Sequence, residues 1–247
     1  MDDHVLVRLK VEKNVVSRSC SSCVLRSLCL PGKISHSMLD KIDKLIQVRK
    51  HLKAGDALYY VGSPFHGLYA VKSGLMKIES YHEDGKVQVN GFYMKGEIYG
   101  FDGIDTHRHL CSSIAIEDSE LCLIPFDTIE HKGEDYEPLK HHIYALMSRE
   151  IGHYHSHMML LGSAHGEERL ASFLLDFSYR MRERGSSANN LILRMTREDI
   201  GNYLGMKVET VSRIFTRFQE MGLLEVHNKY IDILDNLKLK ELIDHPH

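Results

Sequence analysis

The chain has 247 residues, of which 43% are apolar and 26% charged, and its formal net charge is −3. These values are typical of a folded globular protein of one large or two ordinary domains, and they exclude a protein drawn to nucleic acid or membrane by its overall charge. No apolar run reaches the roughly 18 residues of a membrane span, and the charged start MDDHVLVRLKVEKN has no signal-peptide core, so we expect a cytoplasmic protein.

Three cysteines lie close together near the N-terminus, Cys20, Cys23 and Cys29. Cytoplasmic thiols stay reduced and the total of five cysteines is odd, so we do not expect stable disulfides. Iron–sulfur clusters are commonly held by four thiolates, and only Cys111 and Cys122 remain as a fourth ligand. Zinc is the main alternative, although structural zinc sites often use two short-spaced cysteine pairs and this chain has one CxxC.

The stretch 35–52 predicts a helix, which Ser35 or Ser37 could cap. Its apolar residues follow a helical spacing, at Leu39, Ile42, Leu45 and Ile46. From about 53 to 128 the pattern changes to short apolar runs with β-branched and aromatic residues, separated by glycines. The Asp-Gly pair in EDGK suits a type I′ hairpin turn. This part is therefore predicted to form a β-barrel or jelly roll.

A helical period returns from about residue 138, with apolar residues alternately three and four positions apart. This set, the heptad row, consists of Tyr144, Met147, Ile151, Tyr154, Met158 and Leu161. Because the row is narrow and its flanks are polar, it favours pairing with a second copy over packing on the protein's own barrel. The same helix is rich in histidine, and we interpret these residues as solvated surface rather than metal ligands: His141, His142, His153, His155 and His157.

The C-terminal part is predicted to begin near Ser163 with a further helix and a short strand, LILRM. The stretch TREDIGNYLGMKVETVSRIFTRFQEMGLLEV then predicts two helices joined by a glycine turn, a helix-turn-helix. Thr196 is the expected N-cap of the first helix, with Asp199 in its first turn, and Gly205 is the break. GLLEVHNKYIDIL reads as two short strands around a His-Asn-Lys turn, the wing of a winged helix.

The second helix, from about 207 to 221, divides into two faces. Its predicted core residues are Val211, Ile214, Phe215 and Phe218. Its predicted DNA-contacting residues are Glu209, Thr210, Ser212, Arg213 and Arg217. Arginine can bind guanine O6 and N7, glutamate can accept from cytosine N4, and hydroxyls can bind bases or phosphates. A helical hairpin with a merely solvated polar face is the alternative, but turn, polar face and wing together favour DNA binding.

With these elements in place, the whole chain resembles the cyclic AMP receptor protein superfamily. Its helix-turn-helix stretch, the cysteine stretch CSSCVLRSLCLP and the segments LYAVKSGLMKIES and GFDGI are similar to the fumarate–nitrate reduction regulator (FNR) branch. The resemblance implies an α+β fold with an N-terminal β-barrel or jelly-roll sensor domain, a long dimerisation helix and a C-terminal winged helix-turn-helix. The implied boundaries are a ligand segment at 1–30, the sensor domain at 31–137, the dimerisation helix at 138–162 and the DNA-binding domain at 163–247.

The resemblance also implies an oxygen-responsive transcription regulator rather than an enzyme. In that branch a [4Fe–4S] cluster promotes dimerisation and binding to a palindromic TTGAT-type promoter site, and oxygen destroys the cluster. By that pattern the ligands are Cys20, Cys23, Cys29 and Cys122, and Cys111 is a bystander. The implied base readers are Glu209, Ser212 and Arg213. The implied partners are double-stranded DNA, a second copy of the chain, and RNA polymerase through loops near 81–86 and 116–121.

Two departures from the superfamily's patterns matter. Cyclic AMP sensors carry an Arg-Ser pair after the Gly-Glu motif of the barrel, and none follows Glu97, so we do not expect nucleotide sensing. The FNR branch often has an acidic residue where this chain has Tyr154, so cluster-free protein is expected to dimerise more readily than its relatives. A redox enzyme remains a third alternative, but the chain shows no clear acid–base or nucleophile constellation.

Overall fold

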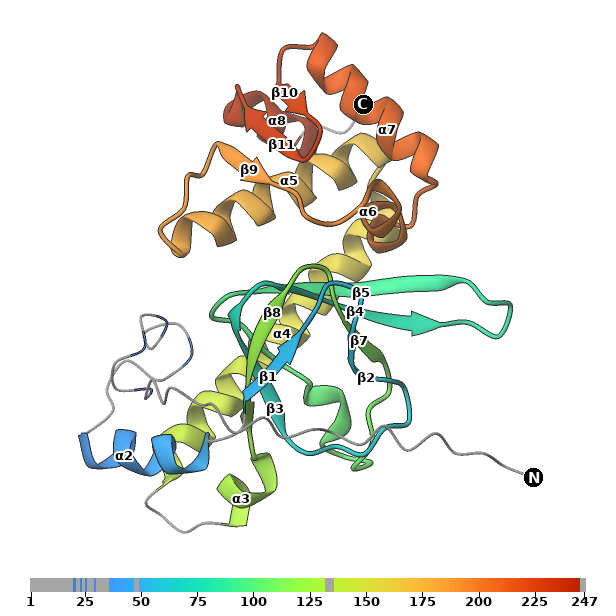
Figure 1. Cartoon of the computed structure of the whole chain (residues 1–247). Coiled ribbons are helices and arrows are strands. Elements are labelled where there is room, and N and C mark those ends of the chain that lie inside the picture. Colours follow the sequence, from blue (N-terminus) through green and yellow to red (C-terminus); the bar gives the residue numbers. More distant parts are fainter. Residues whose placement is uncertain are drawn as a thin grey trace.

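The structure is a computed structural model, and it describes residues 20, 23, 25, 29, 36–46, 49–131 and 136–244 (Figure 1). The described chain has two halves joined by a long helix. We refer to residues 36–131 as the sensor half and to residues 166–244 as the C-terminal half. No helix in these ranges combines the length and the apolar run that a membrane span requires.

The sensor half begins with helix α2 (His36–Leu45) and ends with helix α3 (Phe126–His131). Between them lie eight strands and a short 3-10 turn, η2 (Phe101–Gly103). The strands are β1 (Arg49–Leu52), β2 (Ala57–Tyr59), β3 (Leu68–Ser73), β4 (Leu75–Tyr81), β5 (Val87–Met94), β6 (Ile98–Tyr99), β7 (Ser112–Ala115) and β8 (Ser119–Ile124).

These strands form two four-stranded sheets, in the orders β1-β8-β3-β6 and β2-β7-β4-β5, with every pairing antiparallel. The two-sheet arrangement is of the jelly-roll kind, and no strand ladder closes the described sheets into one barrel. The predicted β-rich sensor half is confirmed, including a hairpin at the Asp-Gly pair between β4 and β5. The expected type I′ turn is wrong, because it needs a positive φ at both residues and only Gly85 has one, at 80°.

One part of the N-terminal prediction is wrong. The helix predicted over 35–52 ends at Leu45, and Arg49–Leu52 is strand β1. Pairing explains the difference, because β1 lies antiparallel to β8 with Arg49 opposite Cys122. A strand at the edge of a sheet can carry charged residues, so RKHL offers little sequence signal for it.

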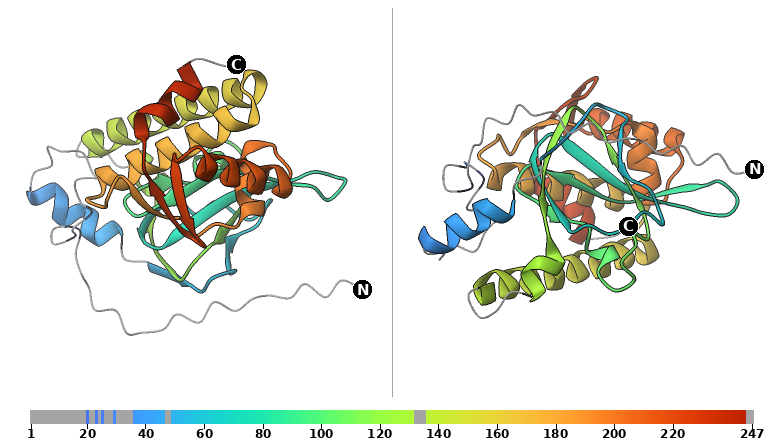
Figure 2. Two further views of the ribbon diagram at one scale, coloured as in Figure 1. Left: turned by 90° about the horizontal axis from the view of Figure 1, so that it is seen from above. Right: turned by 60° about the horizontal axis from the view of Figure 1, so that its bottom comes forward.

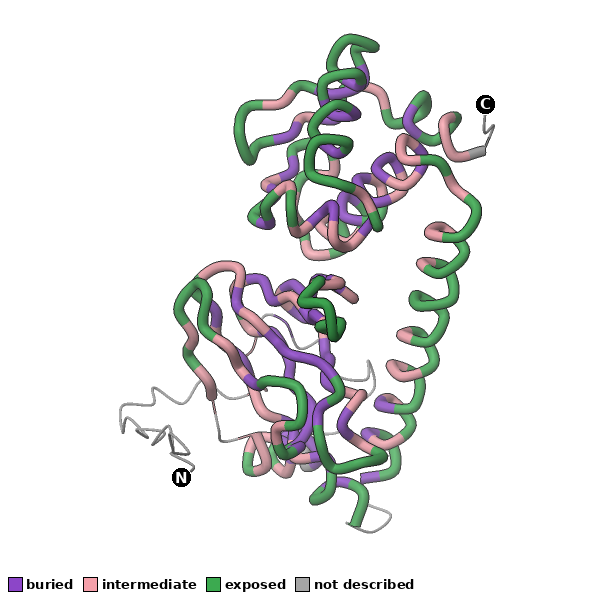
Figure 3. Tube along the Cα trace, turned by 90° about the vertical axis from the view of Figure 1, so that its right-hand side faces the viewer, coloured by how far each residue is buried: buried purple, intermediate pink, exposed green. Residues whose placement is uncertain are grey.

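Helix α4 (Glu137–Ser163) follows the sensor half and runs along the flank of both halves (Figures 1 and 3). It ends at Ala164, and α5 (Gly166–Glu183) folds back beneath the rest of the C-terminal half. The Arg169 guanidinium fixes this corner, because it donates to the carbonyls of Leu161 (2.8 Å), Ala164 (2.9 Å) and Leu204 (3.0 Å). One side chain therefore connects the ends of three helices.

The C-terminal half contains α6 (Arg197–Leu204), α7 (Val208–Glu220) and a three-stranded sheet in the order β10-β11-β9 (Figure 2). Its strands are β9 (Asn190–Ile192), β10 (Leu224–His227) and β11 (Tyr230–Ile233). The predicted winged helix-turn-helix is confirmed, with Asn228 at φ 61° in the wing turn. Two helices were not predicted, α3 and the final helix α8 (Asn236–Asp244).

One of the hydrophobic core clusters contains residues of both halves. Val89, Phe92 and Met94 of β5 pack in the same buried cluster as Phe173 of α5. The Phe92 ring meets the Phe173 ring edge-on at 6.1 Å, and Tyr203 of α6 at 5.3 Å. The C-terminal half therefore packs on the β4–β5 hairpin of its own chain, and Figure 1 shows α6 above β5.

Candidate functional site

The N-terminal cysteines lie against the sensor half. The backbone N–H of Cys20 donates to the Asp43 carboxylate of α2. The Cys29 Sγ lies 3.7 Å from the Gly96 carbonyl oxygen, in the turn between β5 and β6. Cys122 lies in β8, and together with Cys20 and Cys29 it packs at the edge of the core beneath α2 and α4. Segments distant in sequence thus bring these sulfurs to one region.

The same thiols influence one another's acidity. Burial raises the pKa of Cys20 to about 12, the Asp43 carboxylate raises it further, and Cys122 and Cys23 add to the rise. Burial also raises the pKa of Cys29 to about 12, with Cys23 and Cys122 raising it further and Arg184 lowering it. Cys122 has a raised pKa from burial as well. A metal that binds these cysteines as thiolates must therefore displace their protons.

The four thiols are near one another but do not converge. All five cysteines are free, and among the described residues no three His, Cys, Asp or Glu side chains are grouped closely enough to hold one metal ion. The fifth, Cys111, lies apart in the core between the two sheets, where its Sγ donates to Asp102 at 3.2 Å. The structure therefore separates Cys111 from the four thiols that the resemblance selected.

His142 of α4 adjoins this cysteine region. Its ring hydrogen-bonds the backbone of Cys29, while its Nε2 is buried without a partner. Burial lowers the pKa of His142, which keeps the ring neutral near neutral pH. The sequence prediction treated His142 as solvated surface, and this is wrong for its ring. Nothing in the helical spacing distinguishes it from the exposed His141.

The helix-turn-helix has the N-cap and the glycine break that its sequence predicted. Thr196 and Asp199 form a reciprocal capping box, with N···O distances of 2.9 and 3.0 Å, which starts α6. Gly205 ends α6 in the left-handed region at φ 63°. Gly201 allows the turn to close, because a Cβ there would lie 2.6 Å from the Met206 carbonyl oxygen.

Helix α7 has the two predicted faces. Its core residues are all buried: Val211, Ile214, Phe215 and Phe218. Its five candidate DNA-contacting residues are all exposed: Glu209, Thr210, Ser212, Arg213 and Arg217. Two of them have internal partners, since Ser212 donates to the Val208 carbonyl at 3.0 Å and Arg217 binds Glu167 at 2.5 Å. Among the described residues, the candidate base readers without such an internal partner are therefore Glu209 and Arg213.

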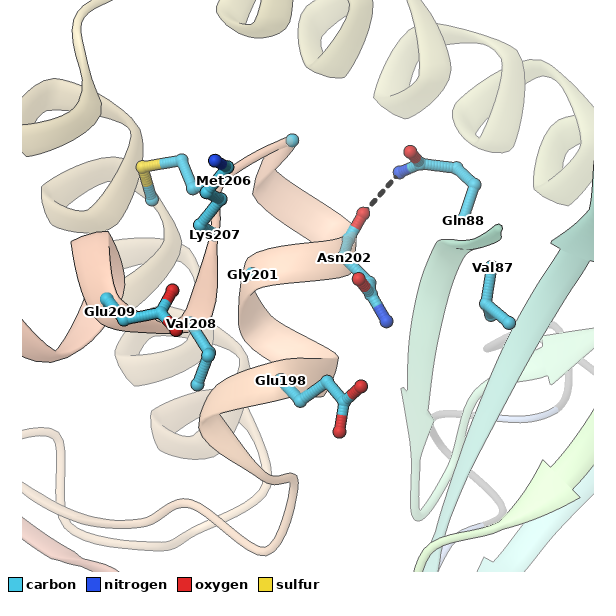
Figure 4. A pocket seen from close by; sticks show the side chains of 10 residues that line it. Val87, Gln88, Glu198, Gly201, Asn202, Met206, Lys207, Val208 and Glu209 are labelled. Carbon is cyan, nitrogen blue, oxygen red and sulfur yellow. Dashed lines mark hydrogen bonds between the residues drawn. The ribbon is translucent and has the colours of Figure 1, made fainter. Parts of the chain in front are cut away.

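A pocket of about 390 Å³ lies between the start of α7 and the β5 end of the sensor half (Figure 4). It is lined by side chains from both halves, including Gln88, Glu198 and Glu209. On one side the Gln88 amide donates to the Asn202 carbonyl at 2.6 Å. The first residues of α7 therefore lie beside the sensor half.

The heptad row is largely uncovered in the single chain. Tyr144, Ile151, Tyr154 and Met158 are exposed, while Met147 and Leu161 are half-buried. Figure 3 shows the exposed length of α4 on the flank of the molecule. Neighbouring Met159 is 69% exposed, so the apolar surface extends beyond the row. Such a surface on one helix is typical of a protein–protein interface.

Glu97, the glutamate of the Gly-Glu motif, has its partners within the chain itself. Its carboxylate binds Arg180 and Arg184 of α5, both at 2.7 Å. Sequence reasoning missed these contacts, because two arginines on a helix surface are normally solvated. Arg108, the arginine that follows this motif in the chain, donates to the Gly62 carbonyl at 2.6 Å.

A two-sheet sensor half, a long exposed helix and a winged helix-turn-helix define a class of two-domain transcription regulators. The chain matches the family described as the Crp-like helix-turn-helix domain over 168–242, and the family of the cyclic nucleotide-binding domain over 49–136. It is 40% identical over 220 residues to the transcriptional activator protein Anr of Pseudomonas aeruginosa, covering 89% of this chain and 90% of the relative.

Two further relatives agree. The Fumarate and nitrate reduction regulatory protein of Escherichia coli is 38% identical over 226 residues, covering 92% of this chain and 90% of the relative. The solved structure of FixK2 from Bradyrhizobium japonicum superposes with a TM-score of 0.71 at 27% identity, covering 79% of this chain and 96% of that chain. The chain belongs to the Crp/Fnr family of transcription regulators. The predictions of that family, of its fold and of a regulator rather than an enzyme are thereby confirmed.

Proposed function

We propose that the chain is a homodimeric, DNA-binding regulator that responds to oxygen through a [4Fe–4S] cluster held by Cys20, Cys23, Cys29 and Cys122. The observation that carries the proposal is the gathering of these thiols at one edge of the sensor half, with Cys111 kept apart. Four thiolates are the usual ligand set of such a cluster. Relatives named for anaerobic and fumarate–nitrate regulation support the choice of signal.

The surroundings of the thiols suit a group that must be shielded. Apolar side chains of α2 and α4 surround Cys29, including Ile42, Leu139 and Ile143. Such a shell controls access of water and oxidant to bound metal. When bound, the cluster supplies an oxygen-labile link between the N-terminal segment and β8. The residues of this chain supply the thiolates, the apolar shell and the hydrogen bond from His142 to the Cys29 backbone.

The output of the regulator is DNA binding through α7. In a two-fold dimer paired through the heptad row, two copies of α7 would address the half-sites of a palindromic TTGAT-type sequence. Arg213, Glu209 and Ser212 are the proposed base readers, and Thr210 and Arg217 the proposed backbone contacts. Loops 81–86 and 116–121 are the proposed surfaces for RNA polymerase.

The test is anaerobic purification of wild type with two matched variants, Cys122→Ser and Cys111→Ser. We expect a brown wild-type protein with about four iron and four sulfide per chain. In air this protein should bleach and then no longer bind its promoter site. Cys111→Ser should behave as wild type and Cys122→Ser should lack the colour. A colourless zinc protein that binds its promoter equally in air and under nitrogen would overturn the proposal.

A further inference from the structure

A small ion cluster crosses from the sensor half to the C-terminal half. Glu97 follows β5 and accepts hydrogen bonds from Arg180 Nε at 3.0 Å and Arg180 Nη2 at 2.7 Å. Arg184 Nη2 donates to the same carboxylate at 2.7 Å. The backbone N–H of Met94 donates to it at 2.9 Å. One carboxylate therefore holds two guanidinium groups from α5, the first helix of the C-terminal half.

The two arginines also bind the backbone of this turn and of strand β5 before it. Arg180 Nη2 donates to the Phe92 carbonyl at 2.5 Å, and Arg184 Nε to the Lys95 carbonyl at 2.7 Å. The cluster is largely buried, with side-chain exposures of 18% for Glu97 and Arg180 and 7% for Arg184. Removing one partner of a buried ion pair is strongly destabilising, because a guanidinium without its carboxylate would be left as an uncompensated buried charge. The turn and α5 are thus held as one unit.

The same turn also contacts Cys29. Gly96, between Lys95 and Glu97, has its carbonyl oxygen 3.7 Å from the Cys29 Sγ. Arg184 is close enough for its charge to act on that sulfur. A three-residue turn therefore separates a candidate cluster ligand from the arginines of the C-terminal half.

We propose that Glu97 is a positioning residue that couples the Cys29 segment to the C-terminal half, through the turn it shares with Gly96 and through Arg180 and Arg184. When the Cys29 segment moves, the turn moves, and the two guanidinium groups transmit this displacement to α5. The inference deepens the proposed function, because it describes how the cysteine site reaches the half that carries α7.

Other ion pairs between the two halves provide a control. Arg194 binds Glu117 at 3.2 Å and Lys77 binds Asp199 at 2.8 Å, and neither pair has a described contact with the cysteine segment. Glu117→Gln therefore removes an ion pair between the halves without touching the proposed route. Glu97→Gln keeps the shape of the side chain and removes only the charge.

The experiment compares full-length wild type, Glu97→Gln and Glu117→Gln as reduced, cluster-free proteins. N-Ethylmaleimide modifies the N-terminal cysteines and displaces their segment with a bulky group, and mass spectrometry confirms the sites. Hydrogen–deuterium exchange of the α5 backbone amides is measured before and after this alkylation. In wild type and Glu117→Gln we expect alkylation to speed exchange in the last turns of α5 by about fivefold or more, at the lower end of coupling between sites. In Glu97→Gln the response should be absent, and Glu97→Asp should restore part of it.

Two outcomes would overturn the coupling: a wild-type α5 that ignores alkylation, or a Glu97→Gln protein that responds as wild type does. If Glu97→Gln fails to fold, Arg184→Met, which removes one of the two guanidinium groups, should halve the response or more. A second arm repeats the exchange measurement on iron-loaded and air-treated protein. Because the alkylation arm requires no metal, absence of a cluster would refute the proposed function and leave the coupling tested independently.

Discussion

Replacing Ile151 by alanine should weaken self-association of the chain. Ile151 is 54% exposed on α4 and lies in the middle of the heptad row. Burying a whole isoleucine side chain contributes about 1.5–3 kcal/mol, so burying the exposed half in a dimer contributes about 0.8–1.6 kcal/mol. A two-fold interface counts the residue twice, which gives about 1.6–3.2 kcal/mol. Alanine loses most of this, so the dimer Kd should rise about 10- to 100-fold.

Sedimentation equilibrium over a range of protein concentrations measures this Kd directly. Alanine is a better helix former than isoleucine, so a loss of dimer cannot be ascribed to a weaker α4. Leu237→Ala is the matched control, since Leu237 is also a highly exposed aliphatic residue, on α8. If Ile151→Ala dimerises as tightly as wild type and Leu237→Ala does not, the interface lies elsewhere and the heptad row has been misread.

Three further outcomes follow from the site. Tyr154→Asp, which places two like charges at the two-fold interface, should convert cluster-free protein from dimer to monomer in sedimentation velocity at micromolar concentration; a wild type that is already monomeric would contradict the role of Tyr154. Arg213→Ala should weaken promoter binding about 10- to 100-fold and relax the preference at one base pair, as gel shifts on altered half-sites would show. Arg217 is already paired with Glu167, so Arg217→Ala should weaken binding to all sequences similarly. Because burial raises the pKa of Cys20 and Cys29 to about 12, both thiols carry protons below that pH and must release them on binding metal. Cobalt(II) affinity should therefore rise about tenfold per pH unit for each proton released, and an affinity equal at pH ~6.5 and ~7.5 would contradict this.

The helix-turn-helix was predictable because its signals are local. The capping box of Thr196 and Asp199 lies within four residues, and the left-handed Gly205 follows directly after α6. The buried and exposed faces of α7 repeat with the helical period, so one turn of sequence already distinguishes them. The β-rich half was predictable as a class for the same reason, from glycine-separated apolar runs and an Asp-Gly hairpin.

What escaped prediction depends on contacts distant in sequence. Strand β1 is set by its pairing with β8, not by the residues Arg49–Leu52. The bond between Glu97 and Arg180 spans 83 positions, and the contact between Cys29 and Gly96 spans 67. No local pattern distinguishes these charges from solvated ones. The choice of Cys122 over Cys111 likewise came from family resemblance, and only the fold separates their environments.

The Cys29 segment occupies a position from which two outputs can be influenced together. Its backbone bonds His142 on α4, the helix that carries the heptad row. Its sulfur contacts Gly96, next to the Glu97 carboxylate that holds α5. The first contact bears on dimerisation and the second on the placement of the C-terminal half. Here one displaced segment would change both, so a variant that breaks the Glu97 contact should leave dimerisation responsive to the cysteine site while DNA affinity no longer follows it.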